Sequence, residues 1–281
     1  MNVSVIIAVF NEEDVIEECL VSLDKQLLKD FEVIVVDDGS YDKSKSKIQK
    51  LKSNLKFKNL LILNQKHKGA GAARNLGAKK AKGKILVFVD ADMTFDKEFL
   101  KKLIEPIENG EAKGTWSREE YVSNWDNVWA RCWNINEGWQ DKRRHPANYP
   151  DLQPVFRAIL KSEYEKVGGF EPGGYDDDWS LSRKLGYEAV NAPGAKFYHK
   201  NPASLVEVFN HAKWVAKRPY KLGVIGKLVA LARSSLPVSV IVGVFKSLQS
   251  NEPKFLIFKI IYDLGIFMGL LEYISLGKSG K

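Results

Sequence analysis

Cysteine is scarce in this sequence of 281 residues, which holds only Cys19 and Cys132. The two lie far apart, and neither belongs to a pair at short spacing. This usage excludes a disulfide framework and argues against a zinc site built on thiolates. It suits a reducing compartment, so we expect the protein to work in the cytoplasm.

Long uninterrupted apolar runs are also lacking. A membrane-spanning helix needs about 20 consecutive apolar residues, and the most apolar stretches after residue 205 are broken by Lys227, Arg233, Lys246, Lys259 and Asp263. The apolar run over residues 3–10 has no basic region before it and passes directly into acidic residues. These patterns disfavour a spanning helix and a secretory signal.

Net charge is nearly absent from the first 204 residues, although the whole chain carries a formal charge of +8. Residues 1–204 hold 32 Lys and Arg against 31 Asp and Glu, whereas residues 205–281 hold 11 against 4. The cations of the tail alternate with aliphatic side chains, which argues against nucleic-acid binding and favours helices in an anionic membrane interface. We predict a helical, amphipathic extension over 205–281. A helical bundle packed on the core, or an interface with another copy of the chain, is the alternative.

Four short runs rich in β-branched and aliphatic residues stand out in the rest of the chain, at 3–10, 31–36, 60–63 and 85–89. Segments with the helical spacing of apolar residues separate them. Strands this apolar are normally buried on both faces, and their alternation with helices predicts an α/β sheet sandwiched by helices over residues 1–204. Ligands of such sheets bind beyond the carboxyl ends of the strands.

Acidic or glycine-rich loops follow these runs. Asp90-Ala91-Asp92 presents two carboxylates to a divalent cation, Mn²⁺ or Mg²⁺, and a solvated turn is the alternative. Asp38, before a glycine, suits hydrogen bonds from a base or ribose, or the capping of the next helix. Residues 68–75 open a helix with small and cationic side chains, as close approach of the backbone to a diphosphate requires.

Together and in this order, these segments resemble the family 2 glycosyltransferases, which have the GT-A fold. The resemblance spans residues 3 to 200 and rests on 5–13 (VIIAVFNEE), 35–40 (VVDDGS), 71–75 (GAARN) and 89–92 (VDAD). It implies a GT-A domain whose mixed sheet is sandwiched by helices. It also implies a metal ligand, Asp92, and a set of nucleotide-binding residues: Ala8, Phe10, Glu12, Asp38, Lys68, Arg74, Asp90 and Ala91. Ala8 departs from the family pattern, which often has proline there.

A second part of the resemblance lies further along the chain. Gly169 belongs to a segment similar to the family's acceptor loop, and the run Asp176-Asp177-Asp178-Trp179 resembles its acidic pair for general-base catalysis. We place the base at Asp178 and, after it, at Asp177, with Asp176 beside the sugar or acceptor. An acidic first turn of the following helix is the alternative.

Two further predictions have strong structural alternatives. His199 closes a segment similar to the strand whose histidine completes the metal site in related enzymes, although a lone histidine is usually structural. Five of the seven tryptophans lie between residues 109 and 154. Trp116 and Trp179 flank the predicted site and suit the face of a sugar or acceptor, although packing in a core is the more frequent use of such residues.

The sequence therefore predicts a metal-dependent, inverting glycosyltransferase that moves a sugar from a nucleotide-diphosphate donor to an acceptor hydroxyl. Inversion is implied by the resemblance alone. A UDP-sugar is favoured as donor and a glycan or lipid-linked molecule as acceptor, with the tail in peripheral contact with the cytoplasmic face of the membrane. The alternatives are a GDP-mannose-type transferase acting on a lipid phosphate and a non-catalytic, membrane-bound module that binds nucleotide-sugars.

Overall fold

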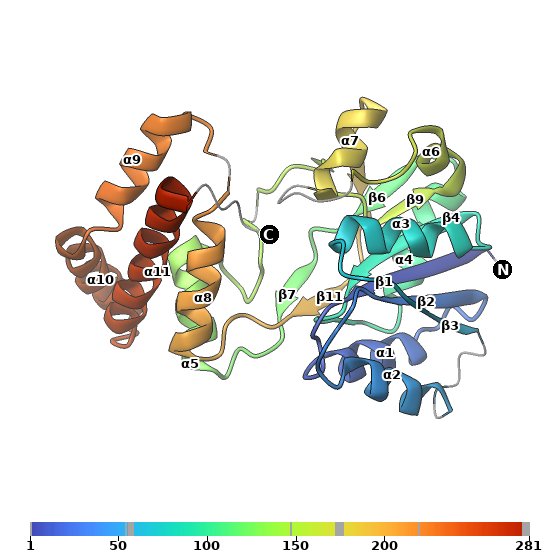
Figure 1. Cartoon of the computed structure of the whole chain (residues 1–281), viewed down its shortest axis with the longest axis horizontal. Coiled ribbons are helices and arrows are strands. Elements are labelled where there is room, and N and C mark those ends of the chain that lie inside the picture. The colour runs from blue at the N-terminus through green and yellow to red at the C-terminus, as the bar shows by residue number, and fades with distance from the viewer. Residues whose placement is uncertain are drawn as a thin grey trace. The chain divides into compact units, whose positions relative to one another are not determined.

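The computed structural model describes residues 2–53, 55, 59–146, 148–171, 177–218 and 220–276. They belong to two units (Figure 1). Unit 1 comprises residues 1–121 and 148–199, and unit 2 comprises residues 122–147 and 200–281. This division differs from the predicted domains 1–204 and 205–281, because residues 122–147 pack with the C-terminal helices.

A mixed sheet forms the centre of unit 1. Its parallel half has the order β3-β2-β1-β4 and consists of β1 (Val3–Val9), β2 (Phe31–Asp37), β3 (Leu60–Asn64) and β4 (Ile85–Asp90). These are the four apolar runs predicted from the sequence. The sheet continues through β9 (Ala158–Leu160), β6 (Gly114–Trp116), β10 (Ala189–Asn191) and β8 (Leu152–Gln153), and β9 is antiparallel to both β4 and β6.

Helices cover both faces of this sheet (Figure 1). One face carries α1 (Ile16–Asp24), α2 (Ser44–Lys52) and α4 (Phe99–Glu108), and the other carries α3 (Ala70–Lys80), α6 (Lys161–Lys166) and α7 (Ser180–Leu185). Successive strand residues point to opposite faces, so Val5 and Ile7 join the first core while Ile6 joins the second. Burial on both faces explains why β1 and β2 are almost wholly apolar.

A second, three-stranded sheet lies beside the carboxyl end of β4. It has the order β5-β11-β7 and consists of β5 (Met93–Phe95), β11 (Phe197–His199) and β7 (Glu120–Val122). β11 runs antiparallel to β5, with His199 opposite Met93. This register brings the end of β11 next to the acidic loop that follows β4.

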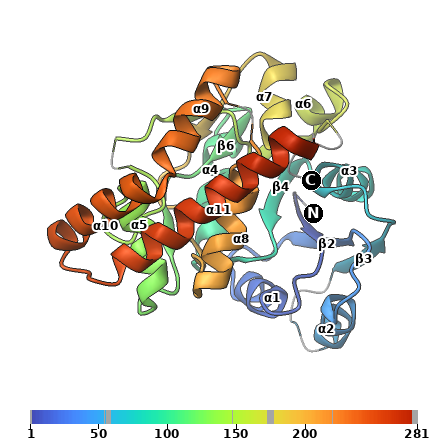
Figure 2. The same cartoon turned by 60° about the vertical axis from the view of Figure 1, so that its left-hand side comes forward.

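Unit 2 is helical and consists of α5 (Val128–Glu137), α8 (Leu205–Val215), α9 (Gly223–Arg233), α10 (Leu236–Ser250) and α11 (Phe255–Leu276). Its core gathers Trp133, Phe255 and Phe258 with their neighbours. α8 and α11 lie side by side (Figure 2). They approach closely because α11 presents Gly265 and Gly269, and a Cβ on Gly265 would lie 2.6 Å from the Phe209 carbonyl oxygen.

Helices α9 and α10 leave many of their large apolar side chains exposed to solvent. Between residues 222 and 248 the exposed large apolar residues are Leu222, Val224, Ile225, Leu228, Val229, Leu236, Val238, Val240, Ile241, Val244, Phe245 and Leu248. In the part of the chain that the structure describes, no single helix is long and apolar enough to cross a membrane. Taken together, α9 and α10 are long and apolar enough to do so, but the two helices are bent by 65° relative to each other.

Candidate functional site

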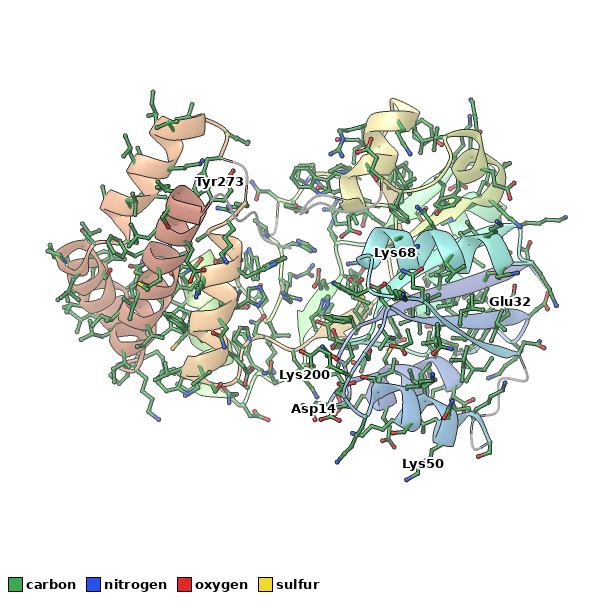
Figure 3. All side chains as sticks on the ribbon, in the orientation of Figure 1. Asp14, Glu32, Lys50, Lys68, Lys200 and Tyr273 are labelled. Atoms are coloured by element: carbon green, nitrogen blue, oxygen red, sulfur yellow. The ribbon has the colours of Figure 1, made fainter. Side chains whose placement is uncertain are left out.

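The register of the parallel strands gathers the predicted site residues at one edge of the unit 1 sheet. Ala8 lies opposite both Val36 and Asp90, and Val9 lies opposite Asp37. Figure 3 shows Lys68 at this end of the strands and Glu32 at the other. The loops after β1, β2, β3 and β4 therefore meet beyond the carboxyl ends of the strands, as predicted for a parallel α/β sheet.

Arg74, from the first turns of α3, joins two of the predicted acidic residues. Its Nη2 donates to Asp90 Oδ1 at 2.7 Å, and its Nη1 pairs with Asp178 Oδ1. A second arginine, Arg157, donates from Nη1 to Asp90 Oδ2 at 3.0 Å. The four side chains thus form one continuous chain of ion pairs that links β4, α3, the segment before β9 and the short 3-10 turn η1 (Asp177–Trp179) before α7.

This chain of ion pairs decides the charge state of Asp90. Burial alone would raise its pKa, but Arg157 and then Arg74 hold the pKa of Asp90 well below its usual range. Burial alone would lower the pKa of Arg157, whereas Asp90, Asp178 and Glu120 raise it above its ordinary value. Asp90 is therefore ionised, and each of its carboxylate oxygens accepts a hydrogen bond from an arginine.

Asp92 is separate from that chain and lies against His199. Its Oδ1 is 3.1 Å from His199 Nε2, and the other ring nitrogen of His199 pairs with Glu120. The Asp92 side chain is 44% exposed, whereas those of His199 and Glu120 are each 10% exposed. A carboxylate behind an imidazole is the arrangement that orients histidine ligands of metals.

The donor chemistry of this pair fits a divalent cation. Asp92 supplies a carboxylate oxygen and His199 an imidazole nitrogen, both of which Mn²⁺ accepts. Among the described residues, no three His, Cys, Asp or Glu side chains converge as a complete metal-binding group. If they bind a cation, Asp92 and His199 form only a partial ligand set, which would need further oxygen ligands from a bound molecule.

Asp38 is buried, and the loop before α3 occupies its carboxylate. Oδ1 accepts hydrogen bonds from the backbone N–H of Lys68 at 2.9 Å and from Gln65 Nε2 at 2.6 Å. Oδ2 accepts from the N–H of Gly69 at 2.8 Å and lies 2.8 Å from His67 Nδ1. Asp38 therefore fixes the loop 65–69, and its predicted contact with a base or ribose stays a prediction.

Three aromatic side chains gather next to this loop. Phe10, at the end of β1, stacks on His67 with ring centroids 4.0 Å apart, and it meets Tyr41 edge to face at 6.0 Å. All three rings are exposed, Tyr41 most of all at 86%. They form an accessible aromatic surface at the strand ends, and only Phe10 among them was predicted as a site residue.

Glu12 lies in the loop after β1, which is tied to the loop after β2. The N–H of Glu12 donates to Ser44 Oγ at 2.8 Å, and the N–H of Asn11 donates to Ser40 Oγ at 3.0 Å. Burial, and then the negative charges of Asp92, Asp90 and Asp42, raise the pKa of Glu12 to about 7. Glu12 therefore faces the carboxylates of the site.

Gly169 has a structural reason to be glycine. Its φ is +74°, and a Cβ there would lie 2.6 Å from Asn75 Oδ1 and 2.7 Å from the Tyr164 hydroxyl. Asn75 holds this loop, because it accepts from the Phe170 N–H at 2.9 Å and donates to the Phe170 carbonyl at 2.9 Å. The predicted contact of Gly169 with an acceptor stays a prediction.

The two tryptophans predicted near the acceptor have different surroundings. Trp116 is 4% exposed, its indole N–H donates to the Asp151 carbonyl at 2.7 Å, and its ring packs in the second core. This position favours the core alternative for Trp116. Trp179 is 51% exposed and follows Asp178, so its face is open to a ligand. Asp176 and the Asp177 side chain lie outside the described residues.

Four side chains of the site have no role in the sequence prediction: Arg157, Glu120, His67 and Asn75. Asn75 stands inside a quoted motif, and His67 directly precedes a predicted nucleotide residue. Arg157 and Glu120 belong to no such motif. The sheet brings them in, since β9 pairs with β4 and β7 joins the sheet of β11.

Known proteins resemble this chain in sequence and in fold. A model of the family described as glycosyl transferase family 2 matches residues 4–168. A dolichol-phosphate mannosyltransferase from Pyrococcus furiosus is 39% identical over 129 residues, which cover 44% of this chain and 36% of that protein. A poly(ribitol-phosphate) β-N-acetylglucosaminyltransferase, TarS, from Staphylococcus aureus is 40% identical over 103 residues, 36% of this chain and 18% of that protein. The chain thus spans about a third or less of these relatives.

Solved structures share the fold along nearly the whole chain. Staphylococcus aureus TarS in complex with UDP-GlcNAc matches with a TM-score of 0.60 at 18% identity, covering 99% of this chain and 93% of that one. A Pyrobaculum calidifontis mannosyltransferase with GDP-Man and Mn²⁺ matches with a TM-score of 0.62 at 18% identity, over 99% and 88%. They confirm the GT-A fold. Because the family model matches more than half of its residues, the chain belongs to glycosyl transferase family 2.

Proposed function

We propose that this protein transfers a sugar from a nucleoside-diphosphate donor to an acceptor hydroxyl with inversion at the sugar. The observation that carries the proposal is the ion-pair chain Asp178–Arg74–Asp90–Arg157, next to the partial ligand set of Asp92 and His199. It sets an acidic side chain for the acceptor beside acidic and imidazole groups for the donor. A module that only binds a nucleotide-sugar needs the groups for the donor but no acidic side chain for the acceptor.

The donor base would bind at the aromatic surface of Phe10, His67 and Tyr41. Exposed rings at the strand ends give a base an aromatic surface to pack on, and the stacking of His67 on Phe10, with centroids 4.0 Å apart, orients these two rings. A UDP-sugar is the favoured donor. GDP-mannose is the alternative, and the named ligands of the two structural neighbours, UDP-GlcNAc and GDP-Man, represent both classes.

Asp92 and His199 would hold the cation, with Glu120 fixing the orientation of the imidazole. A divalent cation bound there neutralises negative charge that builds on the diphosphate leaving group. The chain's own residues supply the rest of the site. Arg157 and Arg74 keep Asp90 ionised and immobile next to that position.

Asp178 is the proposed base, with Asp177 as the alternative. The acceptor oxygen attacks the anomeric carbon as its proton passes to the carboxylate, and the bond from that carbon to the diphosphate oxygen breaks. The electron pair of that bond leaves with the nucleoside diphosphate. Arg74 holds Asp178 Oδ1, so we assign the proton to Oδ2, and general-base transfer requires a carboxylate positioned in this way.

Calorimetric titration with UDP and GDP, each with and without Mn²⁺, tests the donor half of the proposal. We expect Mn²⁺-dependent binding of one nucleotide, UDP in the first instance. The variant Asp92→Asn should lose the Mn²⁺ dependence, whereas Asp96→Asn, a nearby aspartate that bonds the N–H of Glu98 instead, should keep it. Absence of binding by both nucleotides contradicts the proposal, and binding of GDP alone selects the mannose alternative.

The acceptor and the membrane form a second part of the proposal. Exposed apolar side chains over residues 222–248, with the cations of the tail, support peripheral contact with an anionic membrane and hence a lipid-linked or membrane glycan as acceptor. Such contact would place the enzyme at the cytoplasmic face. The alternative is that a second copy of the chain covers the apolar faces of these helices.

Flotation with anionic vesicles tests this second part. The double variant Ile241→Ser and Phe245→Ser removes two side chains that are 68% and 65% exposed, and we expect it to stay with the soluble fraction. Leu27→Ser, which removes a 52% exposed apolar side chain from unit 1, is the matched control and should float as the unchanged protein does. Equal flotation of all three contradicts membrane contact through α9 and α10.

A further inference from the structure

Unit 2 holds a cavity of about 440 Å³ that the proposed sugar transfer does not use. Its walls come from the last residues of α5, the segment after α8, and facing sides of α9, α10 and α11. A volume of this size is ordinary for a small-molecule site. All of its lining residues belong to unit 2, so the cavity is a feature of that unit alone.

Basic residues outnumber acidic residues in the lining of this cavity. Four basic residues, Arg218, Arg233, Lys246 and Lys259, line it against two acidic ones, Glu137 and Asp263. Arg218 and Arg233 are exposed, so a ligand that enters from solvent can reach them.

Two lysines of the lining, Lys246 and Lys259, lie close enough for their charges to act on each other. Lys246 donates from Nζ to the carbonyl oxygens of Ile135 at 2.9 Å and Asn136 at 3.2 Å, which orients its charge without cancelling it. Burial, and then the nearby charge of Lys259, lower the pKa of Lys246 below its ordinary value, although Glu137 acts in the opposite direction. With four basic residues against two acidic ones, the lining keeps an excess of two positive charges, which favours an anionic ligand.

Asp263 supplies a different kind of group at the floor. It is 3% exposed, and its Oδ1 accepts from Lys259 Nζ at 2.8 Å. Its Oδ2 is buried and has no hydrogen-bond partner among the described residues. A buried acceptor without a donor is costly, so a small turn of the side chain that brings this oxygen to a ligand hydroxyl would remove the cost.

The remaining wall is apolar and continues onto the outside of the unit. Val238, Val242 and Ile266 line the cavity, and Ile241 and Phe245 of the same helix α10 are exposed. A ligand with a charged, hydroxylated head and an apolar tail would satisfy both parts. A free sugar phosphate would leave the apolar wall uncovered.

We propose that this cavity binds the head group of an anionic phospholipid that carries a phosphodiester and a free hydroxyl. The phosphodiester lies between Arg218 and Arg233, the hydroxyl donates to Asp263 Oδ2, and the first acyl carbons cover Val238, Val242 and Ile266. The source of the lipid rests on the membrane contact proposed above. Binding of a dissolved short-chain lipid does not need that contact, so the two ideas can fail separately.

The test is titration of the full chain with two short-chain lipids below their micelle concentrations. Dihexanoyl phosphatidylglycerol has the free hydroxyls, whereas dihexanoyl phosphatidylmethanol has the same charge and chains without them. We expect the glycerol lipid to bind about ten-fold more tightly, the effect of one well-placed hydrogen bond to a charged group. Equal binding of the two lipids overturns the assignment of the floor, and glycerol phosphate binding as tightly as the lipid overturns a lipid ligand.

Variants separate the site from general attraction of anions. Asp263→Asn keeps the shape of the side chain and removes the charged acceptor, so it should abolish the preference for the glycerol lipid while both lipids still bind. Arg233→Gln should weaken both by about ten-fold. Lys221→Gln, which removes an exposed cation outside the cavity, should leave both unchanged. Equal losses in Arg233→Gln and Lys221→Gln overturn the proposal.

Discussion

The two units differ in where they place charged and apolar side chains. At the strand ends of unit 1, opposite charges are paired with one another in advance, as Arg74 and Arg157 are with Asp90. Unit 2 turns apolar side chains such as Ile241 and Phe245 outward and keeps a buried acceptor, Asp263 Oδ2, that has no donor among the residues the structure describes. Fixed charges suit chemistry, because they need no reorganisation when a reaction occurs. Exposed apolar faces and open acceptors suit binding of a partner.

The sharpest test of unit 1 is removal of the proposed base. Asp178→Asn should lower kcat by about a hundred- to ten-thousand-fold, because an amide cannot take the acceptor's proton. The amide oxygen can still accept from Arg74, so affinity for the nucleotide should be unchanged. Steady-state kinetics and calorimetry measure the two effects. Asp30→Asn, at an exposed position of the same unit, is the control, and full activity of Asp178→Asn would transfer the role to Asp177.

The ion pairs of unit 1 should also matter for stability. Arg157→Gln leaves Asp90 with one arginine in a mostly buried position, and breaking a buried pair costs about 3 kcal/mol. Amide hydrogen exchange of β1 and β4 would measure the change in free energy of opening. Arg183→Gln breaks the exposed pair with Glu171 and should cost less than about 1 kcal/mol. Equal costs would show that the ion-pair chain is no more structural than a surface pair.

Local sequence predicted the parts of unit 1 that depend on neighbouring residues. Buried parallel strands need apolar side chains on both faces, so β1, β2 and β4 are visible as short apolar runs, and the loops after them carry Asp38, Asp90 and Asp92. The role of Arg157 could not be predicted from the sequence, because its contact with Asp90 depends on the antiparallel pairing of β9 with β4. Pairing between distant segments leaves no periodic signal in either one.

In unit 2, the sequence predicted a helical extension over 205–281 but not its partner, α5. Residues 128–137 join these helices because Trp133 packs against Phe258 of α11 and His211 of α8. Tryptophans at four-residue spacing predict one face of a helix, yet they do not say which surface that face meets. The roles of Trp129 and Trp133 as core residues follow only from the fold.

The backbones of α8 and α11 pack closely in unit 2, and the addition of a single methyl group tests this contact. Gly269→Ala places a Cβ against the Lys213 carbonyl oxygen, which is backbone and cannot move aside easily. We expect a cost of about 1 to 3 kcal/mol, seen as faster amide exchange in α8 and α11 and not in unit 1. Gly243→Ala is the control, since its new Cβ meets the flexible tip of Leu256 first. Equal effects would mean that α8 and α11 can separate freely.

The smallest expected effect concerns Glu12, which faces carboxylates where Asp90 faces arginines. Its pKa is raised from 4.5 to about 7 by burial and then by Asp92, Asp90 and Asp42, so the folded protein binds this proton more tightly than the unfolded chain does. The stabilisation is complete below about pH 4.5 and is lost as pH rises through 7. Glu12→Gln does not titrate and should exceed the unchanged protein in stability by about 1 to 2 kcal/mol above pH 7, a figure reduced for partial exposure, and by nothing near pH 4. Urea denaturation across this range in the presence of a chelator measures the difference, with Glu17→Gln as an exposed control. Parallel pH profiles for both variants and the unchanged protein would mean that the carboxylates at this edge of unit 1 do not repel one another, and that its charges are balanced throughout.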